Sequence, residues 1–178
     1  MKTHIVLLRG INVGGHKKVP MADLRELLSN SGFSEVQTYI QSGNVILKSS
    51  LTNKDDIELT IQKSIQNHFG FEVPVIAKTR LELLRIFEDC PFMDTKKEQS
   101  YFVILSGIPK QELIVKASEK TFENEEFKII NDGLYFHSSA GYGKSKFNMN
   151  WFEKTLNVKA TTRNYKTMVK LLAMSEDS

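Results

Sequence analysis

Residues 36–48 read VQTYIQSGNVILK, and this stretch decides the fold. Two runs rich in strand-forming residues, 36–41 and 45–48, flank Ser42-Gly43-Asn44. Ser, Gly and Asn are typical turn residues, so the stretch predicts a β-hairpin. The elements on either side of the hairpin then determine which fold contains it.

A helix is predicted on each side of the hairpin. The first begins at Pro20, which suits a first helical turn, and ends near Gly32. The second follows Asn53, a good N-cap residue, and ends before Gly70. Each helix has one apolar stripe, formed by Met21, Leu24, Leu27 and Leu28 in the first and by Ile57, Ile61 and Ile65 in the second.

Two further apolar runs, 5–8 and 73–77, predict strands before the first helix and after the second. The order β-α-β-β-α-β within residues 1–78 is that of a ferredoxin-like, split-βαβ unit. We therefore expect an α+β protein whose residues 1–78 form a ferredoxin-like subdomain.

The second half, 79–178, predicts a related but shorter pattern. After a helix over 80–88, the order from Tyr101 is β-α-β-β-α, which is an incomplete version of the same unit. Two C-terminal helices are expected, over 145–156 and 163–173. No low-complexity linker separates the halves, so the second subdomain is expected to pack on the first.

Composition places the chain among ordinary globular proteins, because 40% of its 178 residues are hydrophobic and 25% are charged. A single cysteine, Cys90, excludes an intramolecular disulfide. The first residues do not resemble a signal peptide, so we expect a cytoplasmic protein that does not associate with membranes. The oligomeric state stays open.

Positive charge is concentrated toward the C-terminus. The formal net charge is +3, yet between Gly133 and Lys170 seven Lys or Arg face one acid, Glu153. Such an excess favours an anionic partner such as phosphate, nucleic acid or an acidic protein face, or forms a solvated surface.

A glycine-rich basic loop, RGINVGGHKK at 9–18, separates the first strand from the first helix. Glycines let backbone N–H groups approach an anion, and Arg9 and Lys17 add charge near a helix N-terminus. In the expected fold, Ser42 and Asn44 of the hairpin emerge at the same end of the sheet, close to Asn12. The alternative is a simple turn with a solvated basic end, beside a hairpin whose polar groups satisfy their own backbone.

Two further segments could bind phosphate. Residues 138–145, SSAGYGKS, end like a phosphate loop but have Ser138 in place of its first glycine, so we expect at most a simple anion loop using Lys144 and Ser145. Residues 161–170 predict a threonine-capped helix with a basic row that could follow a phosphate backbone or simply be solvated. That row contains Arg163, Lys166 and Lys170.

Several common chemistries are missing from the sequence. The four histidines have no metal-ligand spacing, so no metal site is predicted. Neither a dinucleotide fingerprint nor a G-x-S-x-G elbow occurs, and no cofactor is predicted. Whether the protein is an enzyme stays open.

Four segments resemble a bacterial family known as the domain of unknown function 1697: LRGINVGG at 8–15, MADL at 21–24, YIQSGNV at 39–45 and ATTRNY at 160–165. The resemblance spans nearly the whole chain. It implies a fold and boundaries but no activity, because the family has no established one.

The resulting hypothesis is a protein that binds a phosphorylated ligand, a nucleotide or a nucleic acid. Alternatives are an enzyme acting on a small phosphorylated or carboxylated metabolite, and a protein-interaction module. We expect the 9–18 loop and the start of the Arg163 helix to share one cleft. The candidate anion-binding residues are Arg9, Asn12, Gly14, Gly15, Lys17, Ser42, Asn44, Lys144, Ser145, Arg163, Asn164 and Lys166.

Overall fold

The computed structural model describes residues 1–139, 141 and 145–176. They form two units: unit 1 comprises 1–83 and 170–178, and unit 2 comprises 84–169. The division passes through two helices, α3 (Arg80–Glu88) and α7 (Tyr165–Met174). The predicted division lay between residues 78 and 79 and assigned 170–178 to the second half.

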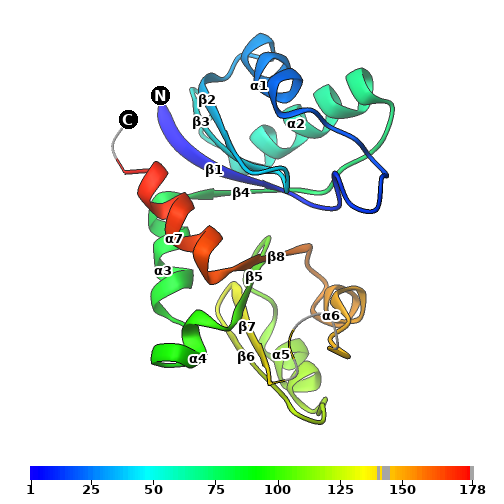
Figure 1. The fold of residues 1–178 in the computed structure, drawn as a ribbon, viewed down its shortest axis with the longest axis vertical. Helices are drawn as coiled ribbons and strands as arrows, with labels where there is room; N and C mark the ends of the chain where they lie inside the picture. The colour runs from blue at the N-terminus through cyan, green and yellow to red at the C-terminus, as the bar shows by residue number, and fades with distance from the viewer. Residues whose placement is uncertain (140, 142–144, 177–178) are drawn as a thin grey trace. The chain divides into compact units, whose positions relative to one another are not determined.

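Unit 1 contains a four-stranded antiparallel sheet with the strand order β2-β3-β1-β4. Helices α1 and α2 lie on one face of this sheet (Figure 1). The elements follow the predicted order: β1 (Lys2–Leu8), α1 (Met21–Asn30), β2 (Ser34–Tyr39), β3 (Asn44–Ser49), α2 (Lys54–Phe69) and β4 (Val75–Thr79).

The core of unit 1 forms where the apolar stripes of the two helices meet the sheet. Alternate residues of the central strands face the helices, because side chains alternate across a strand. The fully buried members on the helices are Leu24, Leu28, Ile57, Ile61 and Ile65, and those on the strands include Val6, Leu8, Val45 and Leu47. These are positions that the sequence patterns predicted.

The ends of α2 are also as predicted. The Asn53 side chain accepts a hydrogen bond from the backbone N–H of Asp55, which caps the helix N-terminus. Gly70 ends the helix in the left-handed conformation, with φ of 80°. Glycine adopts this conformation without the steric cost that a Cβ imposes.

Unit 2 contains a second four-stranded antiparallel sheet, with the strand order β6-β7-β5-β8. Its core joins one face of the sheet to α5 and α6 through residues such as Phe136, Phe152 and Leu156. The elements after α3 are α4 (Asp94–Glu98), β5 (Tyr101–Leu105), α5 (Gln111–Ser118), β6 (Glu125–Ile130), β7 (Gly133–Ser138), α6 (Met149–Leu156) and β8 (Ala160–Asn164).

The prediction that the second unit is incomplete was wrong. Residues 160–164 form a strand, β8, that pairs with β5 from Ala160 opposite Leu105 to Asn164 opposite Tyr101. The threonines of this segment locally favour a helix cap, although β-branched residues also favour strands. Pairing with the buried strand β5 decides between these two local preferences, and the unit has the full order β-α-β-β-α-β.

Two helices begin later than expected, and one was not predicted. Helix α6 begins at Met149 rather than Ser145, because the Asn148 side chain caps it by accepting from the N–H of Trp151. Helix α7 begins at Tyr165 rather than Arg163, because the preceding residues belong to β8. The short helix α4 is the one that the sequence did not predict.

Candidate functional site

Two loops of unit 1 meet at one end of its sheet. Strands β1 and β2 are both antiparallel to β3, so they run in the same direction and the loops that follow them emerge together. The backbone N–H of Leu8 donates to the carbonyl oxygen of Gly43 at 2.7 Å. The predicted proximity of the glycine-rich loop, 9–18, and the hairpin turn, 42–44, is therefore confirmed.

Asn12 connects these two loops through its side chain. Its amide nitrogen donates to the carbonyl oxygens of Gln41 at 2.9 Å and Val19 at 3.0 Å. Its amide oxygen accepts from the N–H of Val19 at 2.8 Å. With both amide hydrogens engaged, Asn12 holds the loop in shape rather than presenting a free donor to a ligand.

The tip of the glycine-rich loop is a tight turn at Gly14 and Gly15. Val13 and His16 pair across it, and the N–H of His16 donates to the Val13 carbonyl oxygen at 3.0 Å. The two glycines have φ of 58° and 78° and are exposed. Their backbone N–H groups, and that of Gly10, donate to no acceptor within the described ranges.

Lys17 reaches from the loop to the segment that precedes β4. Its ammonium group donates to the carbonyl oxygen of Glu72 at 2.6 Å and lies 5.9 Å from the centre of the Phe71 ring. The backbone N–H of Arg9 donates to the Pro74 carbonyl oxygen at 3.1 Å. The loop is therefore anchored to both neighbouring segments, and the charge of Lys17 has a fixed position.

The hairpin turn is tightly packed. Gly43 has φ of 79°, and a Cβ atom there would lie 2.6 Å from the Leu8 Cβ. The fully buried Asn44 donates to the Tyr39 carbonyl oxygen at 3.1 Å and to the Ser42 hydroxyl oxygen at 3.0 Å. Asn44 and Ser42 thus stabilise the turn, as the simpler sequence interpretation allowed.

Positive φ values recur in these two loops. Besides the glycines, which adopt them without strain, they occur at Asn12 and Lys17 and, in the hairpin turn, at Ile40. A β-branched residue such as Ile40 is rare in this region, and its side chain is 51% exposed. Residues held in unfavourable backbone conformations cluster at functional sites, which is a signal that the sequence alone does not give.

The second predicted anion loop, in unit 2, is described only in part. Lys144 lies outside the described residues. The Ser145 hydroxyl oxygen accepts from the backbone N–H of Phe147 at 2.9 Å, and the Lys146 N–H donates to a Glu125 carboxylate oxygen at 2.8 Å. The side chain of Ser145 therefore has a local structural role.

The prediction that Arg163 lies on the exposed face of a helix was wrong. Arg163 lies in β8, only 7% exposed, and its guanidinium donates to the Thr161 hydroxyl at 2.9 Å and to the Thr162 carbonyl oxygen at 2.8 Å. Burial lowers the pKa of Arg163 to about 10, which still leaves it charged at neutral pH. The alternation of a strand turns this side chain inward, whereas helical spacing predicted the opposite.

The neighbours of Arg163 have different roles. The Asn164 side-chain oxygen accepts from the backbone N–H of Thr167 at 2.9 Å, which is the geometry of an N-cap for α7. Lys166 is exposed in the first turn of that helix. Of the two charged residues, Arg163 and Lys166, only Lys166 presents its charge to solvent.

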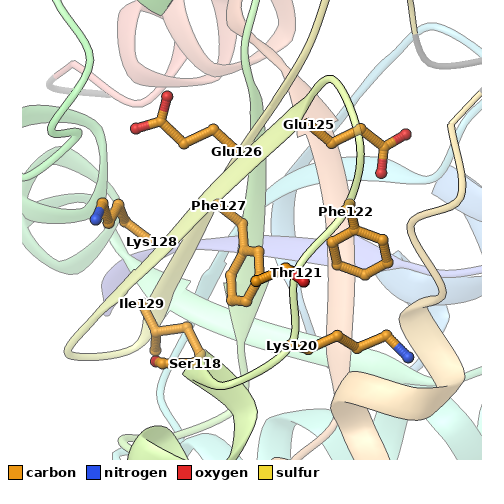
Figure 2. A pocket seen from close by; sticks show the side chains of 9 residues that line it. All are labelled: Ser118, Lys120, Thr121, Phe122, Glu125, Glu126, Phe127, Lys128 and Ile129. Atoms are coloured by element: carbon orange, nitrogen blue, oxygen red, sulfur yellow. The ribbon is translucent and has the colours of Figure 1, made fainter.

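Unit 2 has a pocket of about 330 Å³ beside β6. Figure 2 shows Phe127 in its middle, with Phe122 across from it and charged side chains around them. Its charged groups have internal contacts, because Lys120 lies 4.3 Å from the Trp151 ring centre and Glu126 forms an ion pair with Lys96. Because these charged groups already have partners within unit 2, we do not assign a binding site for a charged ligand to this pocket.

The comparisons with known proteins assign the chain to a family. The model of DUF1697, a protein of unknown function, matches residues 1–135. The chain belongs to this family. The match includes the glycine-rich loop and the hairpin turn, while the ATTRNY segment at 160–165 lies beyond it.

A solved structure extends the comparison of this DUF1697 protein to its whole length. The structure of the conserved bacterial protein SP0830 from Streptococcus pneumoniae is similar with a TM-score of 0.74, at 24% identity over 99% of each chain. At this identity the likeness shows the fold alone. No curated protein matches the chain.

Two features are not present among the described residues of this DUF1697 protein: a membrane-spanning helix and a metal-binding cluster. They contain no helix long and apolar enough to cross a membrane. They also contain no group of three or more His, Cys, Asp or Glu side chains that could hold a metal ion.

Proposed function

We propose that this protein binds a phosphate-bearing ligand at the glycine-rich loop of unit 1. The observation that carries the proposal is that the backbone N–H groups of three exposed residues, Gly10, Gly14 and Gly15, have no acceptor among the described residues. Backbone amides in loops of alternating conformation form anion-binding concavities. Arg9, Lys17 and Lys18, in the same loop, add positive charge.

The loop is already ordered, which favours binding. Asn12 fixes it to the hairpin turn, and Lys17 fixes it to the segment before β4. A preorganised site loses little conformational entropy when the ligand binds. The strained backbone at Ile40 fits the same interpretation, since strain persists where the surrounding structure imposes it.

The other candidate residues have a weaker part in this proposal. Ser145, Arg163 and Asn164 use their side chains in contacts within unit 2, and Lys144 lies outside the described residues. Lys166 stays a candidate charge partner because it is exposed. The cleft expected between the loop and the Arg163 segment stays a prediction.

We also infer that each unit is a ferredoxin-like fold. The order β-α-β-β-α-β and the arrangement of strands four, one, three and two across each sheet support this inference. In unit 1 this arrangement brings the loops after β1 and β2 to the same end of the sheet. Their proximity, on which the proposed site depends, is thus a consequence of topology.

The test uses the full chain, labelled with nitrogen-15, and titrates inorganic phosphate, then a nucleoside monophosphate, then a single-stranded oligonucleotide. The amide resonances of Gly14 and Gly15 are expected to shift, and Lys18→Glu is expected to weaken binding about tenfold by reversing a nearby charge. Lys63→Glu, an exposed change of equal charge on α2, is the control. Glycine resonances that do not move with any of the three probes would refute the proposal.

Salt dependence distinguishes the ligand classes. An oligonucleotide that neutralises several cations loses affinity with a logarithmic slope of about −0.7 per phosphate contacted. A slope near that of one phosphate indicates a compact phosphorylated molecule instead. Comparing the salt dependence of the nucleoside monophosphate with that of the oligonucleotide therefore determines the class of ligand that this loop binds.

A further inference from the structure

A groove of about 570 Å³ lies between α5 and α6 of unit 2, outside the site proposed above. A neighbouring hollow of about 580 Å³ shares Lys154, Asn157 and Val158 with it, so the two form one continuous surface, here named the α5–α6 groove.

The walls of the groove are held by backbone and capping contacts. Helices α5 and α6 pack against each other, and α6 ends at Asn157 in the left-handed conformation with φ of 54°. The N–H of Ser106 donates to the Lys159 carbonyl oxygen at 2.9 Å, and the Lys159 N–H donates to the Ser106 hydroxyl at 3.1 Å. The groove is therefore part of the folded unit.

Four exposed lysines surround the groove. Lys110, Lys116, Lys154 and Lys159 are exposed, and their ammonium groups make no hydrogen bond or ion pair with any other described residue. Other lysines of unit 2 do have partners. For example, Lys97 lies 4.4 Å from the centre of the Phe87 ring.

Two acidic residues lie among these lysines, and one of them has a structural role. A Glu153 carboxylate oxygen accepts from the backbone N–H of Ala160 at 2.8 Å, which holds the start of β8. Glu112 is exposed in the first turn of α5, where a negative charge favours the helix N-terminus. The four lysines therefore give the groove a net positive charge.

The floor of the groove is aliphatic. Half-buried Leu113 and Val158 line it above the buried Pro109 and Leu156, and the side chain of Ile108 is 64% exposed at its edge. None of the described lining residues is aromatic. Proteins that hold single-stranded nucleic acid typically stack bases on aromatic rings, so this floor suits apolar side chains better than bases.

We propose that the α5–α6 groove binds an acidic amphipathic helix of a protein partner. A groove between two helices accepts the apolar face of a third helix, whose anchors recur at i, i+3, i+4 and i+7. The aliphatic floor would take those anchors, and the four lysines would face the acidic side chains on either side of them. This interaction is independent of the phosphate site proposed for unit 1.

The test is a fluorescence anisotropy titration of the full chain with a designed, fluorescein-labelled peptide. The peptide carries Leu at i, i+3, i+4 and i+7 and Glu on its other face, and its comparison peptide has the same composition with the Leu positions scrambled. We expect the amphipathic peptide to bind at least about tenfold more tightly than the scrambled one, since only it aligns its anchors. We also expect its affinity to fall as salt rises.

Paired variants locate the binding surface. Lys116→Glu combined with Lys154→Glu is expected to weaken peptide binding about tenfold or more, and Ile108→Asp is expected to weaken it by placing a charge at the apolar edge of the groove. Lys63→Glu combined with Lys170→Glu changes the net charge equally at exposed positions outside the groove and should leave binding within about twofold. Trp151 fluorescence confirms that unit 2 of each variant is folded.

Three results would overturn the proposal. They are equal binding of the two peptides, a groove variant that binds like its charge-matched control, and tighter binding of a labelled oligonucleotide that the groove variant abolishes. The last result would make the groove a nucleic-acid surface. None of them bears on the phosphate titration of the Gly14 and Gly15 amides, so the two proposals can fail separately.

Discussion

The side-chain amide of Asn12 donates to the carbonyl oxygen of Gln41 at 2.9 Å, although 29 residues separate them in the sequence. The same side chain holds Val19, just before α1, by two further hydrogen bonds. One side chain therefore connects the loop after β1, the start of α1 and the hairpin turn. The shape of the proposed anion site depends on this connection.

Asn12→Gly is expected to loosen the loop without unfolding unit 1. The change removes three hydrogen bonds, each with a net contribution of about 1 kcal/mol, and glycine tolerates the φ of 55° at this position. Hydrogen exchange of the Val19 amide should therefore accelerate about 100-fold. The Ala77 amide, which donates to Glu58 at 2.9 Å, is the internal control and should keep its rate. Less than a threefold change at Val19 would show that Asn12 does not hold the loop.

Gly43→Ala and Gly15→Ala form a matched pair that separates packing from backbone conformation. Both glycines have nearly the same φ, 79° and 78°. A Cβ at Gly43 would lie 2.6 Å from the Leu8 Cβ and 3.1 Å from the Leu8 carbonyl oxygen, whereas one at Gly15 meets no atom within 4 Å. Gly15→Ala should therefore cost about 1–2 kcal/mol of unfolding free energy, and Gly43→Ala more than about 3 kcal/mol. Urea unfolding followed by circular dichroism measures both, and equal costs would contradict the packing argument.

Unit 1 was predictable because its local signals agree with its tertiary structure. The stripes of α1 and α2, the Asn53 cap and the hairpin turn are each readable within a few residues. Topology then brought the loops after β1 and β2 together, as expected. The roles of individual side chains were not readable, because Asn12 and Lys17 bond to carbonyl groups 29 and 55 residues away.

Strand β8 was missed for a related reason. The segment ATTRN contains residues that favour both a helix N-terminus and a strand, and only its pairing with β5 selects the strand. The error then placed Arg163 on an exposed helix face instead of in a buried strand position. Its acceptors, Thr161 and Thr162, are adjacent in sequence, but the backbone conformation that lets it reach them depends on the sheet.

His4 is expected to make the stability of unit 1 depend on pH. This side chain is 2% exposed, and both ring nitrogens are buried without a hydrogen-bond partner among the residues that the structure describes. Burial, the largest influence, lowers the pKa of His4 below its usual 6.5, and Lys2 and Lys54 lower it further while Glu82 opposes the shift. The unfolded chain therefore binds a proton that the folded chain excludes, and stability falls as pH decreases below about 6.5.

The corresponding measurement is the urea midpoint of unit 1 at pH 7.5 and at pH 5.5, for the natural chain and for His4→Leu. Leucine fills much of the same volume and leaves no unpaired polar nitrogen, so the variant should be at least as stable at pH 7.5. It should also lose less stability at pH 5.5 than the natural chain does. His16, His68 and His137 are present in both proteins, so an identical decrease would assign the pH dependence to them instead.

Substitution of Arg163 by alanine is expected to destabilise unit 2, whereas the same substitution at Lys166 is expected to leave its stability nearly unchanged. Arg163 is buried in β8 and donates to Thr161 and Thr162, so Arg163→Ala leaves a cavity and two acceptors without their donor, a loss of about 3 kcal/mol of unfolding free energy in unit 2. Lys166 is exposed, and Lys166→Ala should change stability by less than about 0.5 kcal/mol. Trp151, the only tryptophan, lies in unit 2 and reports its unfolding by fluorescence. A stable Arg163→Ala protein with reduced phosphate affinity would instead make Arg163 a ligand-binding residue, as its position in the sequence first indicated.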